Sequence, residues 1–87
     1  MEFHVFQCKI DRDYFVVTDA AHANSLTSDL CLTPGDELEK IGVFQEMGKE
    51  RVAFDEQLAK DSITSQGYYR FEAKSFDPVA ERPLAMP

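Results

Sequence analysis

The chain has 87 residues, of which 16 are acidic and 9 basic, giving a formal charge of −7 and a pI near 4.6. This length fits one domain, and a hydrophobic content of 44% predicts a folded chain rather than a disordered one. The acidic balance argues against binding to nucleic-acid phosphates. Because no apolar stretch approaches the ~20 residues of a membrane span and no secretory signal is visible, we expect a cytoplasmic protein without membrane contact.

Two strands are predicted at the start of the chain. Residues 2–10 carry apolar side chains on both parities, which is typical of a strand whose two faces are both partly covered. Residues 14–18, YFVVT, are aromatic and β-branched and give the strongest strand signal. Since only the charged residues 11–13 separate these runs, we expect an antiparallel hairpin.

The middle of the chain allows two interpretations. Leu26, Leu30 and Cys31 have the spacing of a short helix of about one and a half turns. Residues 33–41 fit either a helix that begins at Thr33 with Asp36 as its capping-box acid, or a Pro-Gly turn. The Glu-Leu-Glu-Lys run at 37–40 favours the helix, and residues 43–47 then form a third strand.

The clearest helix signal lies at residues 55–66. Asp55 is the expected N-cap and Gly67 the expected C-terminal stop. Leu58 and Ile63 belong to one apolar stripe, and Glu56 and Lys60 have the spacing of an ion pair. A short extended run at 51–54 precedes this helix, and a strand at 68–73 follows it.

These elements predict an α+β fold in the order β-β-α-β-α-β, with a four-stranded, mostly antiparallel sheet and the helix at 55–66 packed on it. We expect one domain over residues 1–76 and a proline-containing tail over 77–87. The predicted core comprises nine apolar residues: Phe3, Val5, Phe15, Val17, Val43, Phe54, Leu58, Ile63 and Tyr69.

The side chains that could support chemistry form no recognisable motif. Cys8 and Cys31 are too few for a disulfide scaffold and are expected to be buried free thiols. Adding His4 and His22 does not give a zinc-site spacing, because His4 and Cys8 lie four strand steps, about 13 Å, apart. No activated nucleophile or phosphate-binding loop is present in the sequence. We therefore predict no enzymatic activity, no catalytic residue, no cofactor and no metal.

The element order, together with Gln66-Gly67-Tyr68-Tyr69 after the capped helix, resembles the YcgL-domain family of small bacterial proteins. The resemblance extends over about residues 1–71. This chain departs from that family after the two aromatic residues, where Arg70-Phe71-Glu72 continues the strand instead of prolines. The resemblance implies an antiparallel sheet with packed helices and supplies no catalytic residue.

Charge and edge strands suggest what the protein does. Residues 29–61 hold nine acidic and four basic side chains, a net charge of −5. We expect a small, non-catalytic interaction module that binds an unidentified protein partner; the alternative is an acidic inhibitor or nucleic-acid mimic that occupies a basic site. The strands at 14–18 and 68–73 are the expected sheet edges for a partner or a weak homodimer. The alternative is a monomer, in which the acidic residues around 14–18 prevent pairing. The predicted contact residues are Tyr14, Val16, Asp36, Glu37, Glu39, Glu46 and Glu50.

Overall fold

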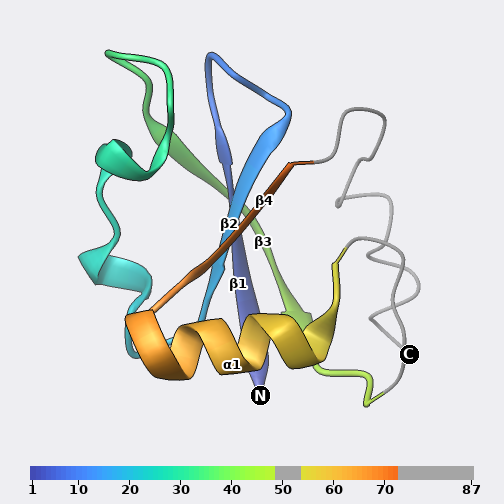
Figure 1. Ribbon diagram of the computed structural model, residues 1–87. Helices are drawn as coiled ribbons and strands as arrows, with labels where there is room; N and C mark the ends of the chain where they lie inside the picture. Colours follow the sequence, from blue (N-terminus) through green and yellow to red (C-terminus); the bar gives the residue numbers. More distant parts are fainter. Residues whose placement is uncertain (49–53, 73–87) are drawn as a thin grey trace.

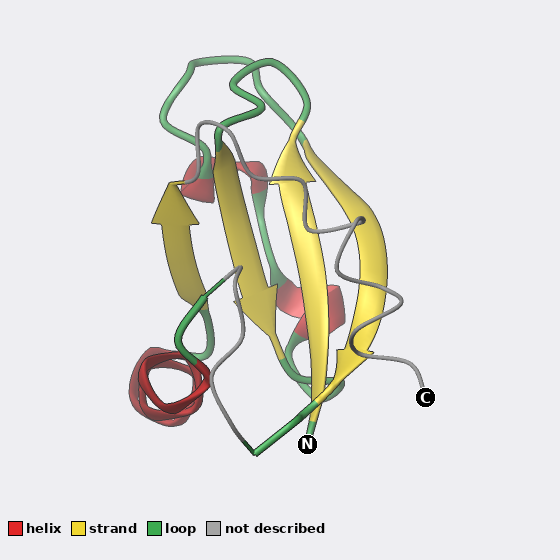
Figure 2. Cartoon of the chain, turned by 90° about the vertical axis from the view of Figure 1, so that its right-hand side faces the viewer, coloured by secondary structure: helices red, strands yellow, loops and turns green. Residues whose placement is uncertain are grey.

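The computed structural model describes residues 1–48 and 54–72. Its elements are β1 (Glu2–Cys8), β2 (Tyr14–Thr18), the 3-10 helices η1 (Ala23–Ser25) and η2 (Ser28–Leu30), β3 (Leu38–Gln45), α1 (Glu56–Gln66) and β4 (Tyr69–Glu72). The four strands form one antiparallel sheet in the order β3-β1-β2-β4. This arrangement, visible in Figures 1 and 2, confirms the predicted α+β class.

The hairpin of β1 and β2 forms the centre of the sheet. Strand β1 pairs with β2 through Val5 opposite Val17, and on its other side with β3 through Phe3 opposite Phe44. The β1–β3 register shifts between Val5 and Phe6, which is typical of a β-bulge. Because both central strands are paired on both sides, β3 and β4 form the two edges of the sheet within residues 1–48 and 54–72.

One face of the sheet carries the main hydrophobic core. Phe3, Val5 and Val17 point to this face and pack with Phe44, Phe54, Ala59 and Ile63. Helix α1 contributes Ala59 and Ile63 and crosses the lower end of the sheet in Figure 1. Phe54 and Phe71 add an aromatic contact with ring centroids 5.6 Å apart. Removing apolar side chains, these rings among them, from water is the main favourable contribution to folding.

The opposite face of the sheet is also covered. This was expected because β1 has apolar residues at both odd and even positions, which point to opposite faces. Cys8, Val16 and Thr18 on this face are buried. The segment of residues 19–37, with both 3-10 helices, runs behind the sheet in Figure 2. The Thr18 hydroxyl donates to the Gly67 carbonyl oxygen at 2.6 Å, which ties the end of β2 to the end of α1.

Helix α1 begins and ends where the sequence predicts. The Asp55 side chain accepts hydrogen bonds from the backbone N–H groups of Gln57 and Leu58 at 2.9 and 3.1 Å, as an N-cap does. Gly67 has φ 94°, and its N–H donates to Ile63 O. This left-handed conformation favours glycine.

The middle of the chain differs from the expected structure. The preferred helix at 33–41 is wrong: Pro34 and Gly35 form a turn, and strand β3 begins at Leu38 instead of residue 43. Pairing of Leu38 with Cys8 outweighs the local helix preference of residues 37–40, because tertiary contacts commonly override propensity. The single short helix expected at 26–31 is instead two 3-10 helices, at 23–25 and 28–30.

Two predicted core residues are exposed. Leu58 is 54% exposed and Val43 is 38% exposed. Their neighbours Ala59 and Phe44 are buried in their place. Phe44 lies opposite the core residue Phe3 in the β1–β3 pairing, and directly paired residues point to the same face. Val43, its neighbour along the strand, therefore points to the opposite face.

Some expectations concern residues outside those described. These are most of the extended run at 51–54, any continuation of β4 past residue 72, and the tail at 77–87, so the domain boundary at residue 76 stays a prediction. In the described segments, no helix has both the length and the apolar character required to cross a membrane.

Candidate functional site

The strand at 14–18 is not a sheet edge, contrary to the prediction. It is β2, which lies between β1 and β4. Val16 is fully buried and Tyr14 is half-buried, so substituting Val16 changes the interior of the protein. The second predicted edge strand, 68–73, is confirmed as an edge in its described part, β4.

The predicted acidic contact residues are divided between the two ends of β3. Asp36, Glu37 and Glu39 lie near the turn of the β1–β2 hairpin, where Glu37 pairs with Lys9 at 3.4 Å. Glu46 follows the other end of β3, roughly 30 Å from Glu37 at the rise of an extended chain. Glu50 lies outside the described residues. The described acids therefore do not form one compact cluster.

Asp36 is a buried structural carboxylate, 3% exposed. Its Oδ1 accepts from the backbone N–H of Ile10 at 2.8 Å and of Glu37 at 2.7 Å, and its Oδ2 accepts from the N–H of Asp11 at 2.9 Å. Burial by itself raises the pKa of Asp36, but the backbone donors outweigh it and lower the pKa below its ordinary value. Asp36 therefore stays ionised, and its carboxylate holds the backbone of the hairpin loop at Ile10 and Asp11.

Glu46 joins the N-terminus to helix α1. Its Oε2 accepts from the Lys60 ammonium at 2.7 Å, and its Oε1 lies 3.2 Å from the N-terminal amine of Met1. The hydrogen bond from Lys60 is the main reason that the pKa of Glu46 is lowered, and the same bond raises the pKa of Lys60. Lys60 thus has its ion pair with Glu46 across the fold, and the predicted partner Glu56 adds a smaller electrostatic attraction that also raises the pKa of Lys60. The Glu56 carboxylate accepts from the N–H groups of Met47 and Gly48.

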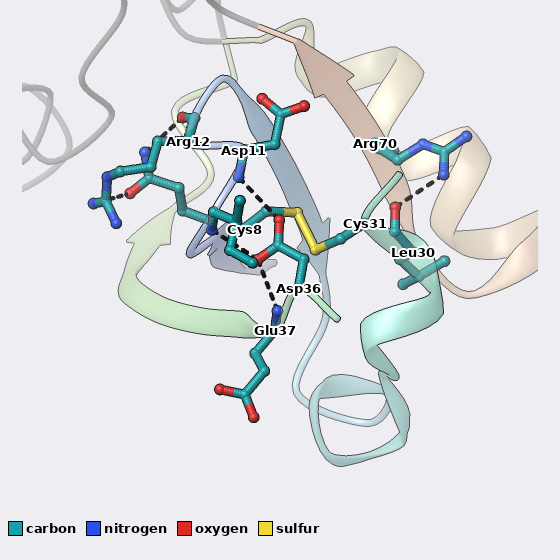
Figure 3. Close-up of a disulfide and its surroundings, with 10 residues drawn as sticks. Cys8, Asp11, Arg12, Leu30, Cys31, Asp36, Glu37 and Arg70 are labelled. Atoms are coloured by element: carbon teal, nitrogen blue, oxygen red, sulfur yellow. Dashed lines mark hydrogen bonds between the residues drawn. A yellow bond between two sulfur atoms is a disulfide. The ribbon is translucent and has the colours of Figure 1, made fainter. Parts of the chain in front are cut away.

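The expectation of free thiols is wrong. Cys8 at the end of β1 and Cys31 after η2 form a disulfide with a Cα–Cα distance of 6.0 Å (Figure 3). It joins the sheet to the segment that covers its second face. The two sulfur atoms and a carboxylate oxygen of Asp36 lie within 4.8 Å of one another. Two cysteines without a motif gave no signal for this pairing, which depends on the path of residues 19–30 around the sheet.

A cavity opens beside this disulfide. Its volume is about 400 Å³, and it is lined by the loop on either side of Cys31 and by Asp36. Cys31 is 7% exposed and is part of the lining, whereas Cys8 is 0% exposed. Asp29 and Glu37 are also among its lining residues. The two ends of the disulfide therefore differ in access from solvent.

Edge strand β4 alternates charged and aromatic side chains. Arg70 and Glu72 are exposed, and Tyr69 and Phe71 are half-buried against the core. The Phe71 ring stacks on Phe15 with centroids 5.1 Å apart. The Arg70 guanidinium donates to the carbonyl oxygen of Leu30 at 3.0 Å, the contact drawn in Figure 3. This bond connects the edge strand to the residue that precedes Cys31.

No protein-family model, curated protein or solved structure matches this chain.

Proposed function

We propose that this protein is a small, non-catalytic interaction module that uses the edge of β4 as its contact surface, and that its partner there is a second copy of the chain. The observation that carries the proposal is the charge pattern of this edge. Arg70 and Glu72 lie on either side of Phe71 in the strand. Their side chains are exposed, and that of Phe71 is half-buried. An edge strand presents unpaired backbone groups to which another strand adds.

The pattern is self-complementary in an antiparallel pair. When two β4 strands pair about a two-fold axis at Phe71, Arg70 of each copy lies opposite Glu72 of the other, and the two Phe71 side chains face each other. Both ion pairs are attractive, and the two sheets join into one. The same pairing in a strand with two like charges at 70 and 72 would place like charges opposite each other, which is unfavourable.

The association expected from this edge is weak. Strand β4 has four residues, and short edge strands limit the number of hydrogen bonds gained. Cross-strand ion pairs contribute about 0.2–1 kcal/mol each. We therefore expect a dimer that forms reversibly at high protein concentration, detectable by sedimentation equilibrium.

Charge exchange between copies tests this pairing directly. Arg70→Glu and Glu72→Arg each replace two attractive pairs with two repulsive ones, so each variant alone is expected to associate at least about tenfold more weakly than the natural chain. A mixture of the two variants restores both attractive pairs. The heterodimer is therefore expected to form at least as well as the natural homodimer.

The matched control is Arg12→Glu, which makes the same charge change at an exposed position of the hairpin loop. This variant is expected to associate as the natural chain does. Association that Arg70→Glu and Glu72→Arg leave unchanged, or a mixture that associates no better than either variant, rules out the β4 pairing. Circular dichroism of each variant checks that it remains folded.

The proposal also includes a cytoplasmic location and a bacterial protein with a YcgL-like layout. A pull-down from the native cell would identify any additional protein partner.

The alternative function, an acidic mimic of nucleic acid, requires carboxylates at regular, phosphate-like intervals. Burial of Asp36 and pairing of Glu46 with Lys60 favour the interaction module over the mimic.

A further inference from the structure

The Cys8–Cys31 disulfide has one end accessible from a cavity and one end enclosed by the sheet. Cys31 lines the cavity of about 400 Å³, and Cys8, at the end of central strand β1, is fully buried. Disulfide exchange requires a thiolate to reach one of the two sulfur atoms, and access decides which sulfur it attacks. Of the two cysteines, Cys31 is the one that lines this cavity, so a small molecule in the cavity approaches the disulfide from the Cys31 side.

We propose that Cys31 is a thiol-exchange site for low-molecular-weight thiols, entered from this cavity, with Cys8 as the leaving group. The inference rests on the cytoplasmic location in the proposed function and does not depend on the β4 dimer. A disulfide in a cytoplasmic protein is typically transient or redox-sensing, so a defined entry point for a thiol is what the proposed location would require.

The first step of the exchange forms one S–S bond and breaks another. The thiolate of the small molecule attacks the Cys31 sulfur, forming a new S–S bond between them. The Cys8–Cys31 bond breaks, its electron pair passes to the Cys8 sulfur, and the resulting thiolate takes a proton from water. A second thiolate can then attack the sulfur of the first small molecule in the mixed disulfide. Its bond to Cys31 breaks, a small symmetric disulfide leaves, and the Cys31 thiolate takes a proton from water, so both cysteines are reduced.

The charges around the cavity select among small thiols. Asp29 and Glu37 are among the residues that line it, and a carboxylate oxygen of Asp36 lies within 4.8 Å of the sulfur atoms. Lys9 is the cation paired with Glu37, at 3.4 Å. Arg70 is a second nearby cation, because its guanidinium donates to the carbonyl oxygen of Leu30, the residue before Cys31. Since the three acids outnumber these two bases, a cationic or neutral thiol enters more readily than an anionic one. The site therefore fits aminothiols such as cysteamine better than glutathione.

Adduct mapping tests the position of attack. The oxidised protein is treated with cysteamine, quenched in acid, alkylated with iodoacetamide and digested for mass spectrometry. We expect the cysteamine adduct on Cys31 and the alkyl group on Cys8, with at least about tenfold excess over the reverse pattern. Equal labelling or an excess on Cys8 would overturn the proposal. Because this measurement uses the natural chain, it does not depend on whether a variant folds.

Two rate measurements separate the cavity route from exchange through unfolded protein. Exchange through the cavity keeps its rate in low, non-denaturing urea, whereas exchange through the unfolded chain accelerates as urea lowers stability. The single-cysteine variants give a matched comparison with cystamine. Cys8→Ser, which keeps Cys31, is expected to react in the folded state, and Cys31→Ser is expected to react only after unfolding. A urea-dependent rate, or equal reaction of both folded variants, contradicts the cavity route.

The charge preference has its own measurement. Rates with cysteamine, mercaptoethanol and glutathione are each divided by the rate of the same thiol with a small uncharged disulfide, which removes differences in intrinsic reactivity. The normalised rate is expected to be about tenfold higher for cysteamine than for glutathione at low salt, and the ratio should shrink in high salt. Glu37→Gln should reduce the ratio of the cysteamine rate to the glutathione rate at low salt. A ratio of one at low salt refutes the assigned class of thiol.

Discussion

The Oδ1 atom of Asp36 accepts the backbone N–H of Ile10 at 2.8 Å, a hydrogen bond between residues 26 positions apart. Its Oδ2 atom accepts the N–H of Asp11. One buried carboxylate therefore accepts two backbone hydrogen bonds from the hairpin loop that follows β1. This side chain thus supports the loop at the disulfide end of the sheet.

Replacing Asp36 with Asn should destabilise this loop. The amide has one acceptor oxygen in place of two and adds an N–H₂ group that faces the backbone donor of Asp11 or Ile10. We expect a clear drop in melting temperature and faster amide exchange at these two residues. Glu37→Gln, an exposed neighbour, is the matched control and should melt close to the natural chain. Equal melting of both variants would show that the Asp36 contacts are not stabilising.

Stability should fall on acidification. The pKa values of Asp36 and Glu46 are lowered from 3.8 and 4.5 in the folded protein. A lowered folded-state pKa adds stability above the unfolded value, and that stability is lost as pH falls through the folded value. Urea midpoints should therefore be constant near neutral pH and decline from about pH 4.5 downward. Glu46→Gln should flatten part of this decline, and a midpoint that rises on acidification would contradict it.

The disulfide should stabilise the fold substantially. It closes a loop with a sequence separation of 23, for which restriction of the unfolded chain predicts about 3 kcal/mol. Oxidised and reduced natural protein, compared by urea unfolding, should differ by this amount, and Cys8→Ala/Cys31→Ala should match the reduced form. Amide exchange should increase most in residues 19–37. Identical unfolding curves for the two redox states would refute this prediction.

Two apolar residues of helix α1 should respond differently to truncation. Ile63 is 3% exposed, whereas Leu58 is 54% exposed. Ile63→Ala removes buried contacts and should lower the free energy of unfolding by about 2–5 kcal/mol. Leu58→Ala changes a surface position and should cost less than about 1 kcal/mol. Thermal or urea unfolding of this matched pair measures both values, and equal costs would mean that the helix face is assigned incorrectly.

Local signals in the sequence determined much of the fold. The β-branched and aromatic run at 14–18 forms β2, and Asp55 and Gly67 mark the ends of α1. These features were predictable because strand preference, N-capping and a left-handed glycine act within a few residues. The α+β class followed from the order of these elements.

Tertiary structure decided the rest. The sequence of residues 37–40 favours a helix, yet pairing with β1 makes them the start of β3, and insertion of β2 between β1 and β4 removed one predicted edge. The disulfide and the Asp36 contacts join residues 23 to 26 positions apart. Such contacts depend on how the chain returns across the sheet, which local propensity does not encode. The composition showed an acidic protein, but only the fold determined that Asp36 lies inside and that Arg70 and Glu72 lie on an edge.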